Sequence, residues 1–334
     1  MTVDLIQGLL LSFAIVVILM PAYIRLLRWA GLGKKVRREG PETHYVKEGT
    51  PTMGGLLVII VVIAVFLLVR GLPEGGVIPP LAALAIVGIL GAFDDWLNAR
   101  TGEGISVRQK LLWQIVFAVF FAWQIQQTYG LTGFNVPFIG AVIIGPLAWV
   151  AFAAFAIVAS SNAVNISDGL DGLAGGTLIF AFVSFLIIAV LNVVPLPGGG
   201  EGNQPNIAFL CALLIGGLLG FLWFNVHPAQ VIMGDAGALS FGATLAVVAL
   251  ITGQILVLPL IGLVFVLETG SVILQVGFYK ATGGRRLFRM SPLHHHFELG
   301  GWDEEKITLR FWIVAVLSGL LGVTLFLASI DRLP

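Results

Sequence analysis

Residues 138–192 read FIGAVIIGPLAWVAFAAFAIVASSNAVNISDGLDGLAGGTLIFAFVSFLIIAVLN. Two apolar runs in this stretch, 138–160 and 172–192, have the length of about 17–25 residues that crosses a bilayer as a helix. The polar, glycine-rich segment 162–176 lies between them. An aspartate near the centre of a membrane helix costs roughly 2.5–3.5 kcal/mol. The stretch therefore predicts spanning helices joined by a segment that holds a polar ligand.

The whole chain of 334 residues repeats this pattern. It is 58% hydrophobic and 11% charged, which is typical of polytopic membrane proteins and excludes an ordinary soluble domain. We predict an all-α fold in one transmembrane domain, 1–334. Its ten predicted spans are 3–28, 53–70, 77–97, 111–129, 138–160, 172–192, 206–224, 237–254, 257–279 and 310–330.

Basic residues predict the orientation of these spans. Of the 18 Lys and Arg residues, all but Arg70 and Arg332 fall on connections after odd-numbered spans or on the adjoining helix ends. Cytoplasmic loops accumulate Lys and Arg, so we expect these connections in the cytoplasm and both termini outside. The same connections hold all five histidines and 13 of the 18 acids. The lone cysteine, Cys211, excludes a disulfide framework. One membrane face is therefore predicted to carry the function.

Two polar clusters come early in the chain. Lys47 and Thr52 precede the second span and could contact phosphate oxygens, although a plain helix start would explain them too. Asp94 and Asp95 end the third span, where the helix dipole disfavours carboxylates unless a cation such as Lys110 offsets them. Adjacent helical side chains diverge by about 100°, so the two aspartates should have different roles. The alternative is a solvated helix end with Lys110 as a membrane anchor.

The glycine-rich segment itself is the third cluster. Asn162, Asn165, Asp168 and Asp171 recur every three residues and would share one face if that part of the chain were helical. A capped helix start needs only one such residue. The repetition therefore indicates a binding surface.

Two further clusters follow later in the chain. Residues 225–237, NVHPAQVIMGDAG, contain Asn225 and Asp235. Asp235 is either a simple N-cap or a ligand of Mg²⁺, which proteins hold by one or two carboxylates plus substrate phosphates. The run His294, His295 and His296 should point in different directions. Because paired zinc ligands on a helix are spaced i, i+4, the run is expected to contact a diphosphate instead.

Taken together, the clusters predict phosphoryl-group transfer between a soluble nucleotide and a lipid. Acids would bind Mg²⁺, Lys and His would contact phosphate oxygens, and amides and carboxylates would hold a nucleoside. No Gly-x-x-x-x-Gly-Lys-Ser/Thr motif occurs, so an energy-coupled ATPase is not expected. A secondary transporter with an aspartate-based ion site is the alternative from another class. The spans show no evident inverted repeat with matching broken helices to support it.

The clusters resemble, in order along the chain, those of the bacterial phospho-N-acetylmuramoyl-pentapeptide transferases. The matching segments are 47–55, 94–95 with 104–110, 162–176, 225–237 and 292–298. The last, PLHHHFE, distinguishes this family from related polyprenyl-phosphate N-acetylhexosamine-1-phosphate transferases. One such relative, a UDP-GlcNAc:polyprenyl-phosphate GlcNAc-1-phosphate transferase, remains the closest alternative.

The resemblance implies a Mg²⁺-dependent enzyme of the bacterial inner membrane, usually a homodimer, with a cytoplasmic cleft and no nucleic-acid partner. It would transfer phospho-MurNAc-pentapeptide from UDP-MurNAc-pentapeptide to undecaprenyl phosphate and release UMP. The implied catalytic residues are Asp94, Asp95 and Asp235, with Asp235 also the metal ligand. The implied phosphate and nucleotide contacts are Lys47, Thr52, Lys110, Asn165, Asp168, Asp171, Asn225, His294, His295 and His296.

Some positions depart from the family pattern. Ile232 stands where many members have a Phe that can stack on uracil, and Ala238 replaces a common Ser. Glu48 replaces a basic residue, and residues 299–300 replace a frequent basic pair. These departures concern nucleotide binding and leave the predicted reaction unchanged.

Glu268 falls inside the ninth predicted span, where an acid is by default a functional residue. It could line a groove for the polyprenyl chain, or it could brace a helix bend through Ser271 and Gln275. We favour the brace, because a groove for a lipid chain should be apolar.

Overall fold

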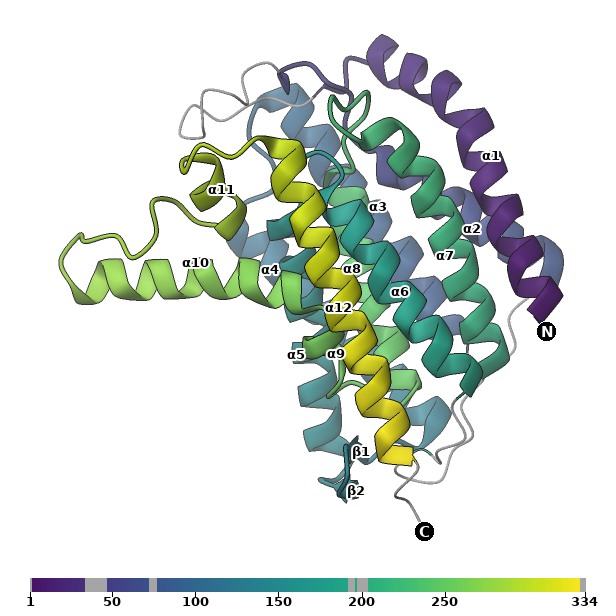
Figure 1. Cartoon of the computed structure of the whole chain (residues 1–334). Helices are drawn as coiled ribbons and strands as arrows, with labels where there is room; N and C mark the ends of the chain where they lie inside the picture. The colour runs from purple at the N-terminus through teal and green to yellow at the C-terminus, as the bar shows by residue number, and fades with distance from the viewer. Residues whose placement is uncertain (1, 34–46, 72–76, 192–195, 197–203, 331–334) are drawn as a thin grey trace.

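The protein is described here from a computed structural model over residues 2–33, 47–71, 77–191, 196 and 204–330. These residues form a helical bundle with one small β-hairpin (Figure 1). The helices and strands are α1 (Thr2–Trp29), α2 (Gly54–Arg70), α3 (Ile78–Thr101), α4 (Val107–Tyr129), β1 (Gly133–Val136), β2 (Gly140–Ile143), α5 (Pro146–Ser167), α6 (Leu173–Leu191), α7 (Gln204–Asn225), α8 (Gly234–Ile251), α9 (Leu258–Ile261), α10 (Leu263–Ala281), α11 (Leu293–Glu298) and α12 (Glu304–Ile330).

Eight of the described helices are long and apolar enough to cross a membrane, namely α1, α3, α5, α6, α7, α8, α10 and α12. Helix α2 is apolar but has only 17 residues. Helix α4 has 23 residues, but five glutamines and two basic residues make it more polar. The predicted all-α polytopic membrane fold is therefore confirmed, and each predicted span corresponds to one or more of these helices.

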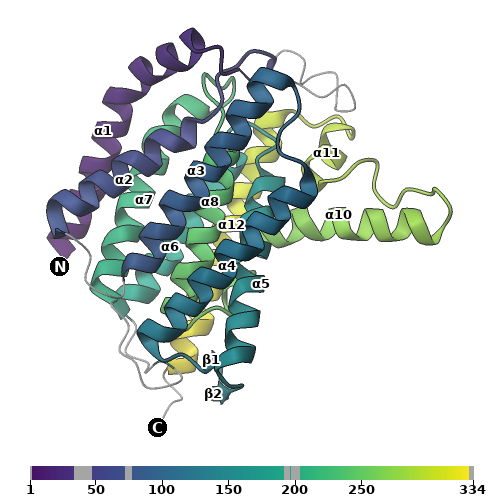
Figure 2. The same cartoon turned by 180° about the vertical axis from the view of Figure 1, so that it is seen from behind.

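Two predicted spans were wrong in detail. The run 138–160 does not form one helix, because Gly133–Val136 and Gly140–Ile143 pair as antiparallel strands and α5 begins only at Pro146. The run 257–279 is divided at Gly262 into the single turn α9 and the longer α10. After this break α10 projects sideways from the bundle, as both views show (Figures 1 and 2).

Helix α8 lies at the centre of the bundle and packs against α2, α3, α5 and α6. All of its residues except Asp235 are buried. Small residues allow this close packing. Gly237 lies against Gly55 of α2, and Gly242 lies against the backbone of α5. The first turn of α8 is therefore held rigidly, and its single acid is presented at the end of the bundle's most buried helix.

The glycine contacts predict a clear difference between two Gly→Ala substitutions. A Cβ at Gly242 would lie 2.6 Å from the carbonyl oxygen of Ser160, whereas a Cβ at Gly270 of α10 would meet no atom within 4 Å. We expect Gly242→Ala to destabilise the protein by about 1–3 kcal/mol, the usual cost of overpacking. Gly270→Ala should be neutral or slightly stabilising. Thermal unfolding in detergent measures both, and equal melting temperatures would contradict the described packing.

Candidate functional site

Two carboxylates and one ammonium group meet where α3, α4 and α8 come together. The Nζ atom of Lys110 donates to Asp94 Oδ2 at 2.9 Å and also to Asp235 Oδ2. The other oxygen of Asp94 accepts the main-chain N–H of Ile105 at 2.5 Å. Asp94 is buried, whereas the side chain of Asp235 is 26% exposed. The lysine therefore lies between two carboxylates that would otherwise repel each other, and one of them remains open to a ligand.

Asp95 has a different environment from its neighbour in the sequence. Its two carboxylate oxygens accept the main-chain N–H groups of Asp235 and Ala236 at 3.1 and 3.0 Å. The first N–H groups of a helix lack partners within the helix and carry partial positive charge, so a carboxylate there is stabilising. Asp95 therefore caps α8 from the adjacent helix and fixes the position of Asp235.

Gly234 makes room for this cap. It has a φ of +75°, a value that L side chains rarely adopt. A Cβ at this position would also lie 2.5 Å from Asp95 and 2.8 Å from the hydroxyl of Thr52. Thr52 itself is buried beside the start of α8.

The predicted common face of the third cluster does not exist, because α5 ends at Ser167. Asn165, on the last turn of α5, donates to Asp235 Oδ1 at 2.6 Å. Asn162 pairs instead with Gln114 of α4. Asp168 follows the end of the helix, and Asp171 lies in the following turn. The segment therefore contributes to two separate clusters. Asn165 contacts Asp235 of α8, and Asp171 belongs to a second cluster.

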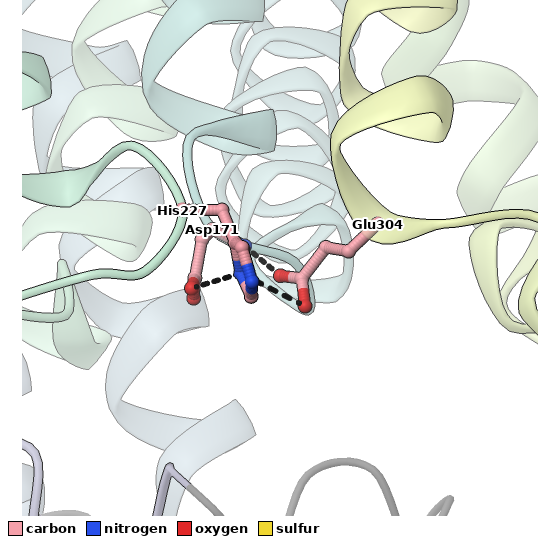
Figure 3. Close-up of side chains that lie close together, drawn as sticks. All are labelled: Asp171, His227 and Glu304. Atoms are coloured by element: carbon pink, nitrogen blue, oxygen red, sulfur yellow. Dashed lines mark hydrogen bonds and ion pairs between the residues drawn. The ribbon is translucent and has the colours of Figure 1, made fainter.

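This second cluster joins four segments that are distant in sequence. Figure 3 shows three of its side chains, Asp171, His227 and Glu304. Lys47 Nζ donates to Asp171 Oδ1 at 2.9 Å and to Glu304 Oε1 at 2.5 Å. Asp171 Oδ2 lies 3.0 Å from His227 Nδ1 and accepts the N–H of Ala229 at 3.1 Å. Glu304 also accepts the N–H of Asp171 at 2.6 Å. The cluster ties the glycine-rich segment to the start of α12 and to the α7–α8 connection.

The charge of Lys47 depends on these partners. Burial alone lowers the pKa of Lys47, but the carboxylates of Glu304 and Asp171 outweigh burial and hold the pKa above its usual value. Ligand atoms of Asp171, His227 and Glu304 lie close enough together to hold a metal ion. The ammonium group of Lys47 already supplies a cation to both acids. In this cluster the cation between the carboxylates of Asp171 and Glu304 is therefore the Lys47 ammonium group.

Asn225 is buried and makes hydrogen bonds to both the glycine-rich segment and the α7–α8 connection. Its Oδ1 accepts the N–H of Gly172 at 3.1 Å, and its Nδ2 donates to the carbonyl of Val231 at 2.9 Å. It is 3% exposed. Asn225 therefore holds the glycine-rich segment against the α7–α8 connection. A phosphate contact of Asn225 stays a prediction.

The three histidines lie on α11 and point in different directions, as predicted. His294 is buried, and its Nδ1 lies 3.0 Å from Glu268 of α10. His295 Nδ1 lies 2.5 Å from Glu298 Oε2. His296 Nδ1 accepts the N–H of Arg289 at 3.1 Å. They do not form a shared metal site, and His294 cannot reach a ligand without a change of its surroundings.

Glu268 is a brace, but not the one that the sequence suggested. Its carboxylate accepts the main-chain N–H of His294 as well as facing Nδ1 of the ring. Ser271 donates to the main-chain carbonyl of Glu268, and Gln275 holds the 287–288 backbone. The side chain is 0% exposed, which excludes a position on an open lipid groove. Glu268 therefore connects α10 to α11.

Comparisons with known proteins agree with this arrangement. The model of glycosyl transferase family 4 matches residues 77–253, and signature 1 of phospho-N-acetylmuramoyl-pentapeptide-transferase matches residues 47–60. A phospho-N-acetylmuramoyl-pentapeptide-transferase of Desulfosudis oleivorans is 44% identical over 94% of this chain and 90% of its own length. The chain belongs to the phospho-N-acetylmuramoyl-pentapeptide-transferase family. Similar proteins of the same name from Desulfotalea psychrophila and Listeria monocytogenes are 41% and 39% identical, over 93% and 96% of this chain and 89% and 97% of their own lengths.

The ranges matched by the two family models cover both clusters with the exception of Glu304. Residues 77–253 include the aspartates of α3 and α8, and residues 47–60 include Lys47 and Thr52. The alternative of a secondary transporter has no support in these comparisons, which name transferases. Of the positions that depart from the family pattern, Ile232 and Ala238 are buried beside the site.

Glu304 is the residue that sequence reasoning missed. It lies in the 302–306 segment that follows the triple histidine, with acids on both sides. Nothing in that local pattern separates it from its exposed neighbours Asp303 and Glu305. Only the folded chain brings it to Lys47 and Asp171.

Proposed function

We propose that this protein transfers phospho-MurNAc-pentapeptide from UDP-MurNAc-pentapeptide to undecaprenyl phosphate and releases UMP. One observation carries the proposal. Asp94, Lys110 and Asp235 come from three helices and contact one another, and the side chain of Asp235 is partly exposed, so a ligand can reach it. Family membership supports the same reaction. UMP release separates this activity from transport, and competition between UDP-MurNAc-pentapeptide and UDP-GlcNAc separates it from the GlcNAc-1-phosphate transferase.

The aspartates fit a magnesium ion. Asp94 Oδ2 and Asp235 Oδ2 already flank one cation, the ammonium of Lys110. Magnesium is usually held by one or two carboxylates together with substrate phosphates and water. Asp235, with Asp94 beside it, would hold the ion, and Lys110 would then be available to a phosphate oxygen. When bound, the ion would supply positive charge that neutralises the substrate phosphates and departing UMP.

The proposed reaction is a direct displacement. An oxygen of the lipid phosphate attacks the sugar-linked phosphorus of the donor, and the bond from that phosphorus to the bridging oxygen of UMP breaks. Asp94 takes the proton of the lipid phosphate where one is present, and Lys110 stabilises charge on the phosphate oxygens. One phosphoanhydride replaces another, so the step is reversible and needs no energy input. A phosphoryl group trapped on Asp94 would exclude direct attack.

The nucleotide side of the site is assigned to the second cluster. Lys47 and Asp171 lie on it, and Asn165 and Asp168 flank the intervening turn. Glu304 determines the position of Lys47, because its carboxylate accepts hydrogen bonds from both the lysine ammonium and the main-chain N–H of Asp171.

This assignment predicts that Glu304→Gln weakens capture of the donor. Loss of a charged hydrogen bond costs about 1.5–3 kcal/mol, equivalent to roughly 10- to 150-fold in the KM for UDP-MurNAc-pentapeptide. The KM for the lipid should change little. Initial rates at varied concentrations of each substrate measure this. Asp303→Asn removes the adjacent, exposed carboxylate and is the matched control. An equal effect of both substitutions would contradict the role of Glu304.

The remaining assignments follow from the positive-inside pattern and the resemblance. We propose that the chain lies in the inner membrane of a bacterium as a homodimer, with the aspartates and Lys47 on the cytoplasmic side. The placement of nearly all basic residues on alternate connections supports this orientation.

A further inference from the structure

Helix α12 presents three side chains in a row to the turn that precedes α6. Glu304, Thr308 and Trp312 are spaced four residues apart, so they share one face of the helix. The carboxylate of Glu304 accepts the main-chain N–H of Asp171 at 2.6 Å, and the hydroxyl of Thr308 donates to the main-chain carbonyl of Asp171 at 3.2 Å. The indole Nε1 of Trp312 donates to the main-chain carbonyl of Gly172 at 3.2 Å. One helix face therefore holds two consecutive residues of the turn.

The main-chain polar groups of these two residues are all hydrogen-bonded. Asn225 Oδ1 accepts the N–H of Gly172 at 3.1 Å. The carbonyl of Gly172 also accepts the N–H of Gly176 at 2.9 Å. Within the residues that the structure describes, Thr308 alone donates to the carbonyl of Asp171. Both residues of the turn are buried, and a buried polar group without a partner costs about 1–3 kcal/mol. Loss of the Thr308 hydroxyl therefore favours other arrangements of the turn.

Packing alone does not account for the two donors on α12. Thr308 is 6% exposed, and a valine would fill the same space. The indole of Trp312 lies against Gly176, where a Cβ would be 2.2 Å from its nitrogen, and its ring centroid is 6.4 Å from that of Phe180. A purely apolar ring would make the same ring contact. The hydroxyl and the indole N–H are therefore available to fix the backbone of the turn.

This turn carries a side chain on which the second cluster depends. Asp171 Oδ1 accepts a hydrogen bond from Lys47 at 2.9 Å, and Asp171 Oδ2 lies 3.0 Å from His227 Nδ1. The directions open to a side chain depend on the φ and ψ angles of its own residue. A rearranged backbone at residues 171–172 would therefore move the carboxylate of Asp171 away from Lys47.

We propose that Thr308 and Trp312 are positioning residues, which hold the turn so that Asp171 and Lys47 are preorganised for the nucleotide of the donor. The inference rests on the proposed transferase function and extends it to α12, which lies outside the ranges that the family models match. A site that is correctly arranged in only a fraction of the molecules loses apparent affinity by that fraction. The two residues therefore act on nucleotide affinity and not on the lipid.

Thr308→Val and Trp312→Phe test the proposal, because each removes a donor and keeps an apolar group in its place. We expect Thr308→Val, which leaves a carbonyl unsatisfied, to raise the KM for UDP-MurNAc-pentapeptide about 5- to 150-fold, equivalent to about 1–3 kcal/mol. Trp312→Phe removes one of two hydrogen bonds and should raise it about 2- to 13-fold, equivalent to about 0.5–1.5 kcal/mol. The KM for undecaprenyl phosphate and kcat should change little. Initial rates at varied concentrations of each substrate measure these constants.

Binding of radiolabelled UMP to the full-length protein in detergent provides a readout that is independent of turnover. Its dissociation constant should rise in parallel with the KM for the donor. Thr308→Ser keeps the hydroxyl and should keep the wild-type values. Thr324→Val is the matched control on the same helix, because the Thr324 hydroxyl donates to Leu320 of α12 itself. Thermal unfolding shows that each variant is folded, and Trp312→Phe decides the question if Thr308→Val does not fold.

Two results would overturn the proposal. One is an unchanged KM for the donor and an unchanged affinity for UMP in the folded variants Thr308→Val and Trp312→Phe. The other is an equal loss in Thr308→Ser and Thr308→Val, which would assign the effect to packing and not to the hydroxyl. Failure of the proposed function is distinguishable, because the wild type itself would then release no UMP from donor and lipid.

Discussion

Asp235→Asn is expected to lower UMP release by roughly 10²- to 10³-fold or more while the protein remains folded. The substitution removes the charge that Lys110 offsets and the oxygen best exposed to a metal and substrate. Removal of one preorganised electrostatic group from a reaction centre costs roughly 10²- to 10³-fold in kcat, or about 2.7–4 kcal/mol. Steady-state UMP release measures the activity, and size-exclusion chromatography in detergent measures the fold.

Binding of Mn²⁺ in place of Mg²⁺, followed by electron paramagnetic resonance, provides a readout that is independent of turnover. In Asp235→Asn the resonance signal of protein-bound Mn²⁺ should disappear. Asp303→Asn is the matched control, because it removes an exposed acid outside both clusters. Wild-type rates in Asp235→Asn would show that the meeting point of α3, α4 and α8 is not the reaction centre.

The second large effect separates the two neighbouring aspartates. Asp94→Asn should lower kcat by a similar factor with a nearly unchanged melting temperature, because Asp94 contacts Lys110 and one loop amide. Asp95→Asn should lower the melting temperature as well. It turns an NH₂ group toward an N–H of Asp235 or Ala236 and leaves a buried donor unsatisfied, at a cost of about 1–3 kcal/mol.

Comparison of kcat and melting temperature for both variants tests this separation. Asn165→Ala removes one hydrogen bond to Asp235 without changing a charge. It therefore measures how far kcat falls when only the positioning of Asp235 is disturbed. Identical losses of stability and kcat in Asp94→Asn and Asp95→Asn would contradict the separate roles.

Much of the fold was predictable because the length of an apolar run is a local property. The runs identified the spanning helices, but run length does not distinguish helix from strand. Residues 138–145 were therefore assigned to a helix, although Gly140–Ile143 pairs with Gly133–Val136. The break at Gly262 was missed for a similar reason. The ninth predicted span runs without a break over 257–279, yet the chain completes one helical turn at Leu258–Ile261 before α10 begins.

The candidate site was predictable as a set of residues but not as an arrangement. That Asp94 and Asp95 would differ followed from helix geometry. That Asp95 caps α8 depends on the approach of α3 to α8, which no local pattern encodes. Asp171 and Glu304 are 133 residues apart, and the partner of Glu268 lies on another helix. Tertiary contacts also explain why Asn225 and His294, predicted to face a ligand, are buried.

The most direct test of the central claim is UMP release by the detergent-purified, full-length protein supplied with UDP-MurNAc-pentapeptide and undecaprenyl phosphate. Mg²⁺ and the lipid are each omitted in turn. We expect release that requires both and that falls to background in Asp235→Asn. Absence of release from the monodisperse, lipid-supplied wild type, or release that is independent of the lipid, would contradict the proposed transferase.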